Sequence, residues 1–177
     1  MKLNKIASIF VMTFGIVVAG NTYANQGSGT VTFTGSIIDA ACSVNPDSSE
    51  QEIDLGQIAS AELMDKGTST PRNFDIKLEK CTLKEDGKAP TVKVTFGGSQ
   101  AVAGDTNLFG ITGDASGAGI VITDGSGAKI PVGGTTNARS LIVGNNTLSF
   151  SAYLQGLGGA LTTGDFYSVT NFTLAYD

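Results

Sequence analysis

The stretch GDFYSVTNFTLAYD, residues Gly164–Asp177 of the 177-residue chain, decides the predicted fold. In it Phe172, Leu174 and Tyr176 alternate with polar or small residues, which is the pattern of a β-strand that buries one face. The pattern continues to the next-to-last residue of the sequence. Because a terminal strand without a neighbour leaves backbone N–H and C=O groups unpaired, we expect an exposed sheet edge here.

A second strand pattern, GTVTFTGSI, occupies residues Gly29–Ile37. Val31, Phe33 and Ile37 alternate with threonine or serine, and Gly35 takes an apolar position of the pattern. From the pattern alone the simplest interpretation is an ordinary first strand that packs on its own core. The glycine would then mark a β-bulge.

The first residues have the layout of a secretory signal peptide. Two lysines precede an apolar run at Ile6–Ala19, and a small residue, Ala24, ends the segment. The run is too short to span a membrane as a helix. We therefore expect residues 1–24 to be removed, which leaves 153 residues from Asn25 onward and room for one exported domain.

The rest of the chain has strand patterns separated by clusters of Gly, Ser, Asp and Asn, which favour tight turns. One helix candidate, Ser60–Lys66, lies in the long segment between the two cysteines. The patterns predict an all-β protein, a single antiparallel β-sandwich. The strand patterns are Phe74–Lys80, Val92–Phe96, Ile120–Thr123, Lys129–Val132, Thr147–Leu154 and Val169–Tyr176.

Cys42 and Cys81 are the only cysteines of the sequence. In an exported protein such an isolated pair normally forms a structural disulfide. The sequence has no histidine, and the two cysteines are far apart, so neither a metal site nor a redox motif is expected.

Composition and charge exclude several functions. The 11 Lys and Arg residues face 16 Asp and Glu residues, and the expected mature chain is more acidic still, at −7. With no basic stretch, nucleic acids and anionic membranes are not expected partners. No later segment approaches 18 apolar residues, so we expect no direct insertion into a membrane.

Catalytic and cofactor chemistry is equally absent from the pattern. No nucleophile, base and orienting group stand together, so we expect neither an enzyme nor a cofactor. Asp105, Asp114 and Asp124 lie in glycine-rich stretches but in no spaced acidic motif for calcium. We interpret them as exposed residues that form turns.

Taken together, these features resemble the structural pilins of the chaperone–usher pathway, similar to Pap-type and type 1 major subunits. The resemblance covers the signal segment, the Gly-x-Val-x-Phe-x-Gly start, both cysteines and the ending from Gly164 to the penultimate Tyr176. It also includes the motif Ile53-Asp54-Leu55-Gly56.

The resemblance implies an immunoglobulin-like sandwich of six strands that lacks its last strand and is completed by donor-strand complementation. It assigns residues 25–37 to a donor extension and residues 38–177 to the pilin domain. Gly35 becomes the small position of the donor, where a side chain would collide with the accepting wall. The donor residues are then Gly29, Val31, Phe33, Gly35 and Ile37. The acceptor groove and chaperone-binding strand comprise Gly164, Phe166, Phe172, Leu174, Tyr176 and Asp177.

The function implied is a subunit that polymerises into the shaft of a surface fimbria and supports cell adhesion. The implied partners are identical or related pilins, a periplasmic chaperone and an outer-membrane usher. Two alternatives stay open: a minor adaptor or terminator pilin of the same pathway, and a secreted carbohydrate-binding β-sandwich. The length leaves no room for a separate receptor-binding domain, and the absence of tryptophan weakens the second alternative.

Overall fold

The computed structural model describes residues 29–82, 89–102 and 105–177. The predicted signal peptide, residues 1–24, lies outside them. The chain separates into two units, Met1–Ile37 and Ile38–Asp177. Residues 29–37 belong to no helix or strand, and the side chains of Val31, Phe33 and Ile37 are at least 75 % exposed.

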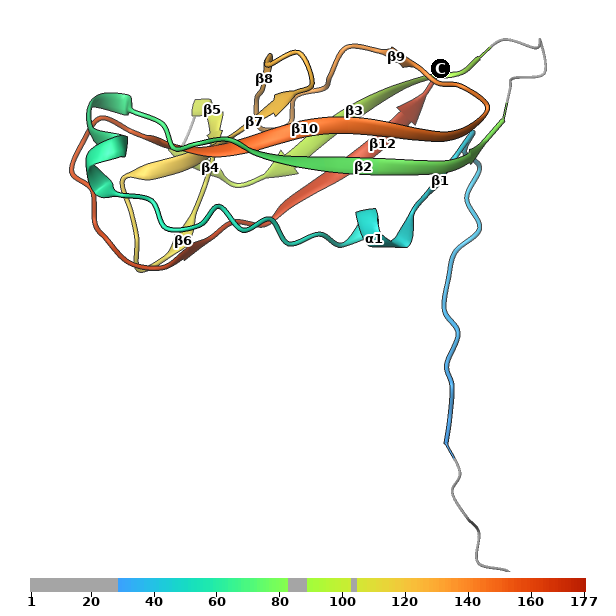
Figure 1. Ribbon diagram of the computed structural model, residues 1–177, viewed down its shortest axis with the longest axis horizontal. Coiled ribbons are helices and arrows are strands. Elements are labelled where there is room, and N and C mark those ends of the chain that lie inside the picture. The colour runs from blue at the N-terminus through green and yellow to red at the C-terminus, as the bar shows by residue number, and fades with distance from the viewer. Residues whose placement is uncertain (1–28, 83–88, 103–104) are drawn as a thin grey trace, which may run out of the picture. The chain divides into compact units, whose positions relative to one another are not determined.

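The larger unit contains a main sheet in which every pair of neighbouring strands is antiparallel. Its longest strands, at the centre, carry the alternating apolar residues that the sequence shows (Figure 1). The order across the sheet is β1 (Ser43–Val44), β2 (Arg72–Cys81), β10 (Gly144–Gly156), β7 (Ala118–Asp124), β5 (Asp105–Phe109) and β4 (Gln100–Val102), while β8 (Lys129–Ile130) also pairs with β7.

A second sheet contains the C-terminal strand. Its order is β12 (Thr170–Tyr176), β3 (Thr91–Gly98) and β9 (Arg139–Ser140), so β12 lies at the sheet edge. A short ribbon pairs β11 (Phe166–Tyr167) with β6 (Thr112–Gly113). Two short helices complete the described elements, α1 (Pro46–Ser49) and the 3₁₀ helix η1 (Ser60–Lys66).

Four phenylalanine rings join the two sheets. Phe74 and Phe150 come from the main sheet, with ring centroids 5.5 Å apart. Phe96 of the second sheet meets Phe150 edge to face at 5.0 Å, and Phe172 of β12 lies 6.4 Å from Phe96. Because aromatic rings bury large apolar areas and prefer offset or edge-to-face contacts, this cluster holds the sandwich together.

The predicted β-sandwich is confirmed, and six of the described strands hold five residues or more. The predicted helix at Ser60–Lys66 is present as a 3₁₀ helix. It is not the only one, because α1 also forms where Asn45 caps the backbone N–H of Asp47. The strands β4 and β5 were not predicted, since the glycine cluster around them indicated turns.

The interpretation of Asp124 as a turn residue is confirmed. Its carboxylate accepts hydrogen bonds from the N–H groups of Ser126 and Ala128 and from the Ser126 hydroxyl. These bonds, the Ser126 hydroxyl first, hold the pKa of Asp124 below its usual value. Among the described residues no group of three acidic, His or Cys side chains could hold a metal ion.

The predicted disulfide is also confirmed and joins Cys42 to Cys81. Nearby, the Thr82 N–H donates to the Ala41 carbonyl at 3.0 Å. Gly144, the first residue of β10, lies opposite Cys81 in the sheet register. The bridge therefore ties the beginning of the domain to the end of β2.

We predict that replacing both cysteines by serine lowers the free energy of unfolding. The bridge spans 39 residues of sequence, and a loop of that length contributes about 4 kcal/mol in the chain-entropy model. Urea unfolding of the purified subunit measures the effect. The single variant Cys42→Ser should match the double variant, and an unchanged urea midpoint would contradict the prediction.

Candidate functional site

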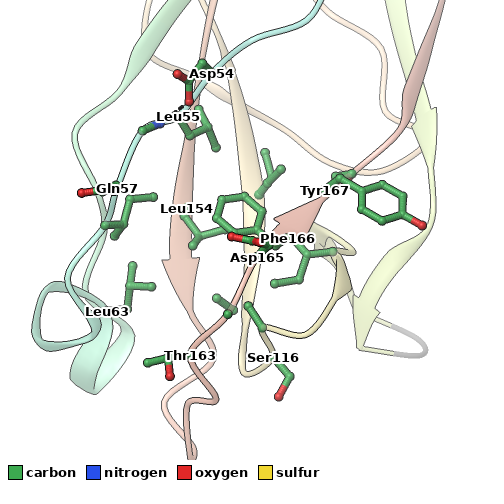
Figure 2. A pocket seen from close by; sticks show the side chains of 18 of the residues that line it. Asp54, Leu55, Gln57, Leu63, Ser116, Leu154, Thr163, Asp165, Phe166 and Tyr167 are labelled. Atoms are coloured by element: carbon green, nitrogen blue, oxygen red, sulfur yellow. Dashed lines mark hydrogen bonds between the residues drawn. The ribbon is translucent and has the colours of Figure 1, made fainter.

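The candidate site is an open groove of about 730 Å³ on the larger unit. One wall is the segment from Gln51 to Ile58, and the other is the segment from Leu161 to Ser168. In Figure 2, Leu55, Leu154 and Phe166 lie in the space between these two segments, whereas Tyr167 points away from it. The groove therefore separates two parts of the chain that are more than a hundred residues apart.

The floor of the groove is apolar. Leu63, Ala118 and Leu154 are buried and form a small core cluster of their own. Side chains packed against this cluster are only partly buried, because the groove leaves one side of them open. They are Ile58, Ile111, Ile120, Leu161 and Phe166.

The first wall has the composition of a strand but pairs with none in the described part of the chain. Ile53, Leu55 and Ile58 are half-buried and face the groove, between exposed neighbours. The Asp54 carboxylate accepts the Gly56 N–H at 2.7 Å, and Gly56 has a φ of +75°. This local turn interrupts the extended segment.

The edge strand β12 continues the second wall, and its side chains are less covered than those of its neighbour. Phe172, Leu174 and Tyr176 are half-buried, whereas their direct partners on β3 are at most 3 % exposed. The side of β12 away from β3 accounts for this difference, because no strand of the described residues pairs with β12 there. The three β12 side chains belong to a core that lacks one strand.

Within the part of the chain that the structure describes, the backbone of β12 is also unpaired on that side. Asp177 and Thr91 exchange two hydrogen bonds, of 2.9 and 3.0 Å, so Asp177 directs its N–H and C=O toward β3. Hydrogen-bonded and non-hydrogen-bonded pairs alternate along an antiparallel ladder. The N–H and C=O groups of Phe172, Leu174 and Tyr176 therefore point to the open edge.

The end of β12 carries an ion pair and a buried hydroxyl. The Lys93 Nζ donates to the Asp177 carboxylate at 2.6 Å, a pair exposed to solvent. The Tyr176 hydroxyl is buried and has no hydrogen-bond partner among the described residues. Burial raises the pKa of the Tyr176 phenol above its ordinary value.

The backbone at Gly164, within the second wall, requires a glycine. Its φ is +151°, and a Cβ there would lie 2.7 Å from the Asp114 Cβ. The N–H groups of Asp114 and Ala115 donate to the Asp165 carbonyl at 2.9 and 3.1 Å. The glycine thus lets the last segment approach the loop before β7 closely enough to bond with it.

The structure brings some of the predicted site residues together. Gly164 and Phe166 line the groove directly, and β12 extends the same wall through its half-buried side chains. Their role as acceptor, and the donor role of residues 29–37, remain predictions. The prediction missed the opposite wall, although the alternation of Ile53 and Leu55 in the sequence indicated a further apolar face.

A β-sandwich whose terminal strand has one open edge beside an apolar groove is an incomplete immunoglobulin-like domain. Comparison with known proteins agrees with this class: the model of the family described as "Fimbrial protein" matches residues 31–177. The chain belongs to this family, and it is a structural subunit of a surface fimbria of the chaperone–usher type. Among the described residues, no helix has the length and apolar character needed to cross a membrane.

Similar proteins include the Fimbria A protein of Serratia marcescens, 49 % identical over 99 % of both chains. The Major MR/P fimbria protein of Proteus mirabilis is 45 % identical, again over 99 % of both chains. The crystal structure of the P pilus rod subunit PapA matches with a TM-score of 0.70 and 33 % identity. That match covers 78 % of this chain and all of the other.

We predict that Tyr176→Phe removes a late ionisation from the alkaline titration of the subunit. Burial favours the neutral phenol of Tyr176. The contribution of this neutral side chain to folding stability is therefore complete below the unfolded pKa of tyrosine, near 10, and declines as pH rises toward the folded pKa of Tyr176. The variant should also be at least as stable at neutral pH, because an unpartnered buried hydroxyl is lost.

Absorbance at 295 nm against pH and urea unfolding measure the two effects. The control Tyr167→Phe replaces an exposed ring and should leave the late ionisation in place. A Tyr176→Phe variant that keeps the late phase would show that the buried phenol is not its source.

Proposed function

We propose that this chain is a shaft subunit that polymerises by donor-strand exchange. Residues 29–37 of one subunit enter the groove of the next and pair with the open edge of β12. One observation carries the proposal: a core that lacks one strand and an exposed segment with strand pattern occur in the same chain. The segment supplies the strand that the core lacks, and the core covers the apolar side chains of the segment.

The dimensions of the two parts agree. A strand rises about 3.3 Å per residue, so the segment Gly29–Ile37 spans roughly 30 Å when extended. The wall from Phe166 to Tyr176 has a similar length, roughly 35 Å by the same measure. A single donor segment can therefore run beside most of this wall.

The donor side chains also suit an apolar groove. Val31, Phe33 and Ile37 fall on one face of an extended segment, and burying each contributes roughly 1.5–3 kcal/mol. The backbone of the donor would satisfy the N–H and C=O groups of Phe172, Leu174 and Tyr176. Alternate side chains filling pockets while the backbone extends a sheet is the general mode of β-strand addition.

Gly35 supports the donor role in a different way. A Cβ at this position would have no atom within 4 Å, and the residue has no positive φ that only glycine tolerates. Nothing in the described chain therefore requires a glycine here, and the β-bulge interpretation has no support. A tight contact with a second subunit gives a reason for the missing side chain.

The remaining partners follow from the same groove. Before assembly, a periplasmic chaperone would cover the open edge of β12, and an outer-membrane usher would exchange it for the next subunit's donor. A shaft role is favoured over an adaptor or terminator role by the relatives, one of which is named a major fimbria protein and another a rod subunit. The role proposed is structural and not enzymatic.

We predict that a self-complemented variant is a stable monomer. In it residues 25–37 are deleted, and a Gly-rich linker followed by the segment Gly29–Ile37 is appended after Asp177. The appended strand acts at an effective concentration near millimolar, so its burial should outweigh closing the short loop. Its melting temperature should lie well above that of the truncated chain, and it should neither polymerise nor bind a chaperone.

The matched control carries the same tail with Val31, Phe33 and Ile37 replaced by serine. It has the same length and backbone but lacks the side chains that fill the groove. Equal melting temperatures for the two tails would refute the acceptor role of this groove.

We further predict that Gly35→Asn stops polymerisation without unfolding the subunit. A side chain forced into a tight contact costs typically 1–3 kcal/mol, and a buried amide adds a desolvation penalty. Electron microscopy should show no fibres, while the variant still melts normally when its own groove holds an unmodified tail. Fibres of normal length would disprove the tight position of Gly35.

A further inference from the structure

Two exposed aliphatic side chains lie outside both the groove and the donor segment. Ile142 and Val143, in the loop between β9 and β10, are 68 and 62 % exposed. The side chain of Asn146 holds this loop, accepting the Ile142 N–H at 2.9 Å and donating to its carbonyl at 2.8 Å. The adjacent Leu141 is buried and donates its N–H to the Pro90 carbonyl. The loop therefore presents two apolar side chains in a fixed conformation.

This loop lies at the same end of the domain as the domain's first residues. Gly144 pairs with Cys81, and Cys81 is bonded to Cys42, a few residues after the exposed Ile38. We call this region the disulfide end. Figure 1 shows β1, β9 and the C-terminus at this end of the larger unit, and the η1 coil at the other.

The donor segment places the disulfide end against a second subunit, an inference that rests on the proposed function. Ile37 is bonded directly to Ile38, and consecutive Cα atoms are only about 3.8 Å apart. When the donor fills a neighbour's groove, the domain that follows it starts at the exit of that groove. The disulfide end of the donating subunit thus lies beside the accepting subunit.

Strand direction indicates which end of the accepting subunit is met. Every strand pair in the described part of the chain is antiparallel, and antiparallel pairing is slightly more stable than parallel. A donor antiparallel to β12 has Ile37 beside the start of β12, at the Phe166 end of the groove. Ser60 and Leu63 of η1 line the same groove, and η1 lies at the end of the larger unit away from the C-terminus (Figure 1). Met64 of η1 is 62 % exposed.

We propose that Ile142 and Val143 of each subunit pack against the η1 end of the subunit that holds its donor strand. The partner is a second copy of this chain, and Met64 is the exposed apolar residue on the accepting side. The contact adds a second interface, between the domain bodies, to the donor strand in its groove. It slows dissociation and limits bending between neighbouring subunits.

A defined dimer tests this contact. The donating subunit keeps residues 25–37, and its own groove is filled by an appended copy of residues 29–37. The accepting subunit lacks residues 25–37. The measured quantity is the rate at which the dimer dissociates in guanidinium, followed by gel filtration.

The double variant Ile142→Ser/Val143→Ser is placed in one subunit at a time. In the donating subunit it should speed dissociation by about tenfold or more, the order expected when two aliphatic side chains lose apolar cover. In the accepting subunit the same variant should change nothing, because the disulfide end there meets no neighbour. Met64→Ser should speed dissociation when it is placed in the accepting subunit and should change nothing in the donating subunit.

Melting of the self-complemented monomer should be unchanged by the Ile142→Ser/Val143→Ser variant, since both side chains are exposed. Equal effects in the two subunits, or no effect in either, overturn the proposed contact while the donor role stands. If the unmodified subunits form no dimer, the donor role itself fails and the contact fails with it.

Discussion

The open edge of β12 is the constraint on which the rest of the structure depends. On one side β12 pairs with β3 along its whole length, and the inward-facing side chains of β3, Val92, Val94 and Phe96, are buried. On the other side it pairs with no strand of residues 29–82, 89–102 and 105–177, and Phe172, Leu174 and Tyr176 are only half covered. An exposed apolar edge of this kind invites pairing with another chain, which soluble proteins ordinarily avoid. In a polymerising subunit the same feature is the means of assembly.

The other features of the domain keep that edge open and in place. The segment around Asp54 lies across the groove from Phe166 and pairs with no strand in the described part of the chain, so it does not close the gap. Gly164 lets the last segment bond to the loop before β7, and the Lys93–Asp177 pair fixes its far end. The phenylalanine cluster and the Cys42–Cys81 disulfide stabilise the remaining sandwich without the missing strand.

Much of this could be predicted from the sequence because strand patterns with one buried face are local. The alternation of Phe172, Leu174 and Tyr176 defined β12, and an isolated cysteine pair in an exported chain defined the disulfide. The first groove wall was not predicted, because Ile53 and Leu55 form too short a pattern to be assigned without knowing what they face. Strands β4 and β5 were missed for a related reason: tertiary pairing overrides the turn preference of their glycine-rich surroundings.

Hydrogen exchange at single residues of β12 tests the central claim most directly. The amides of Phe172, Leu174 and Tyr176 point to the open edge, whereas those of Thr173 and Ala175 bond to β3 by the alternation of the ladder. With a peptide of residues 25–37 added to a subunit lacking that segment, the first three amides should change from rapid to slow exchange. Thr173 and Ala175 should be protected in both states. Protection of all five amides without the peptide, or rapid exchange of the first three in its presence, would contradict a donor strand on this edge.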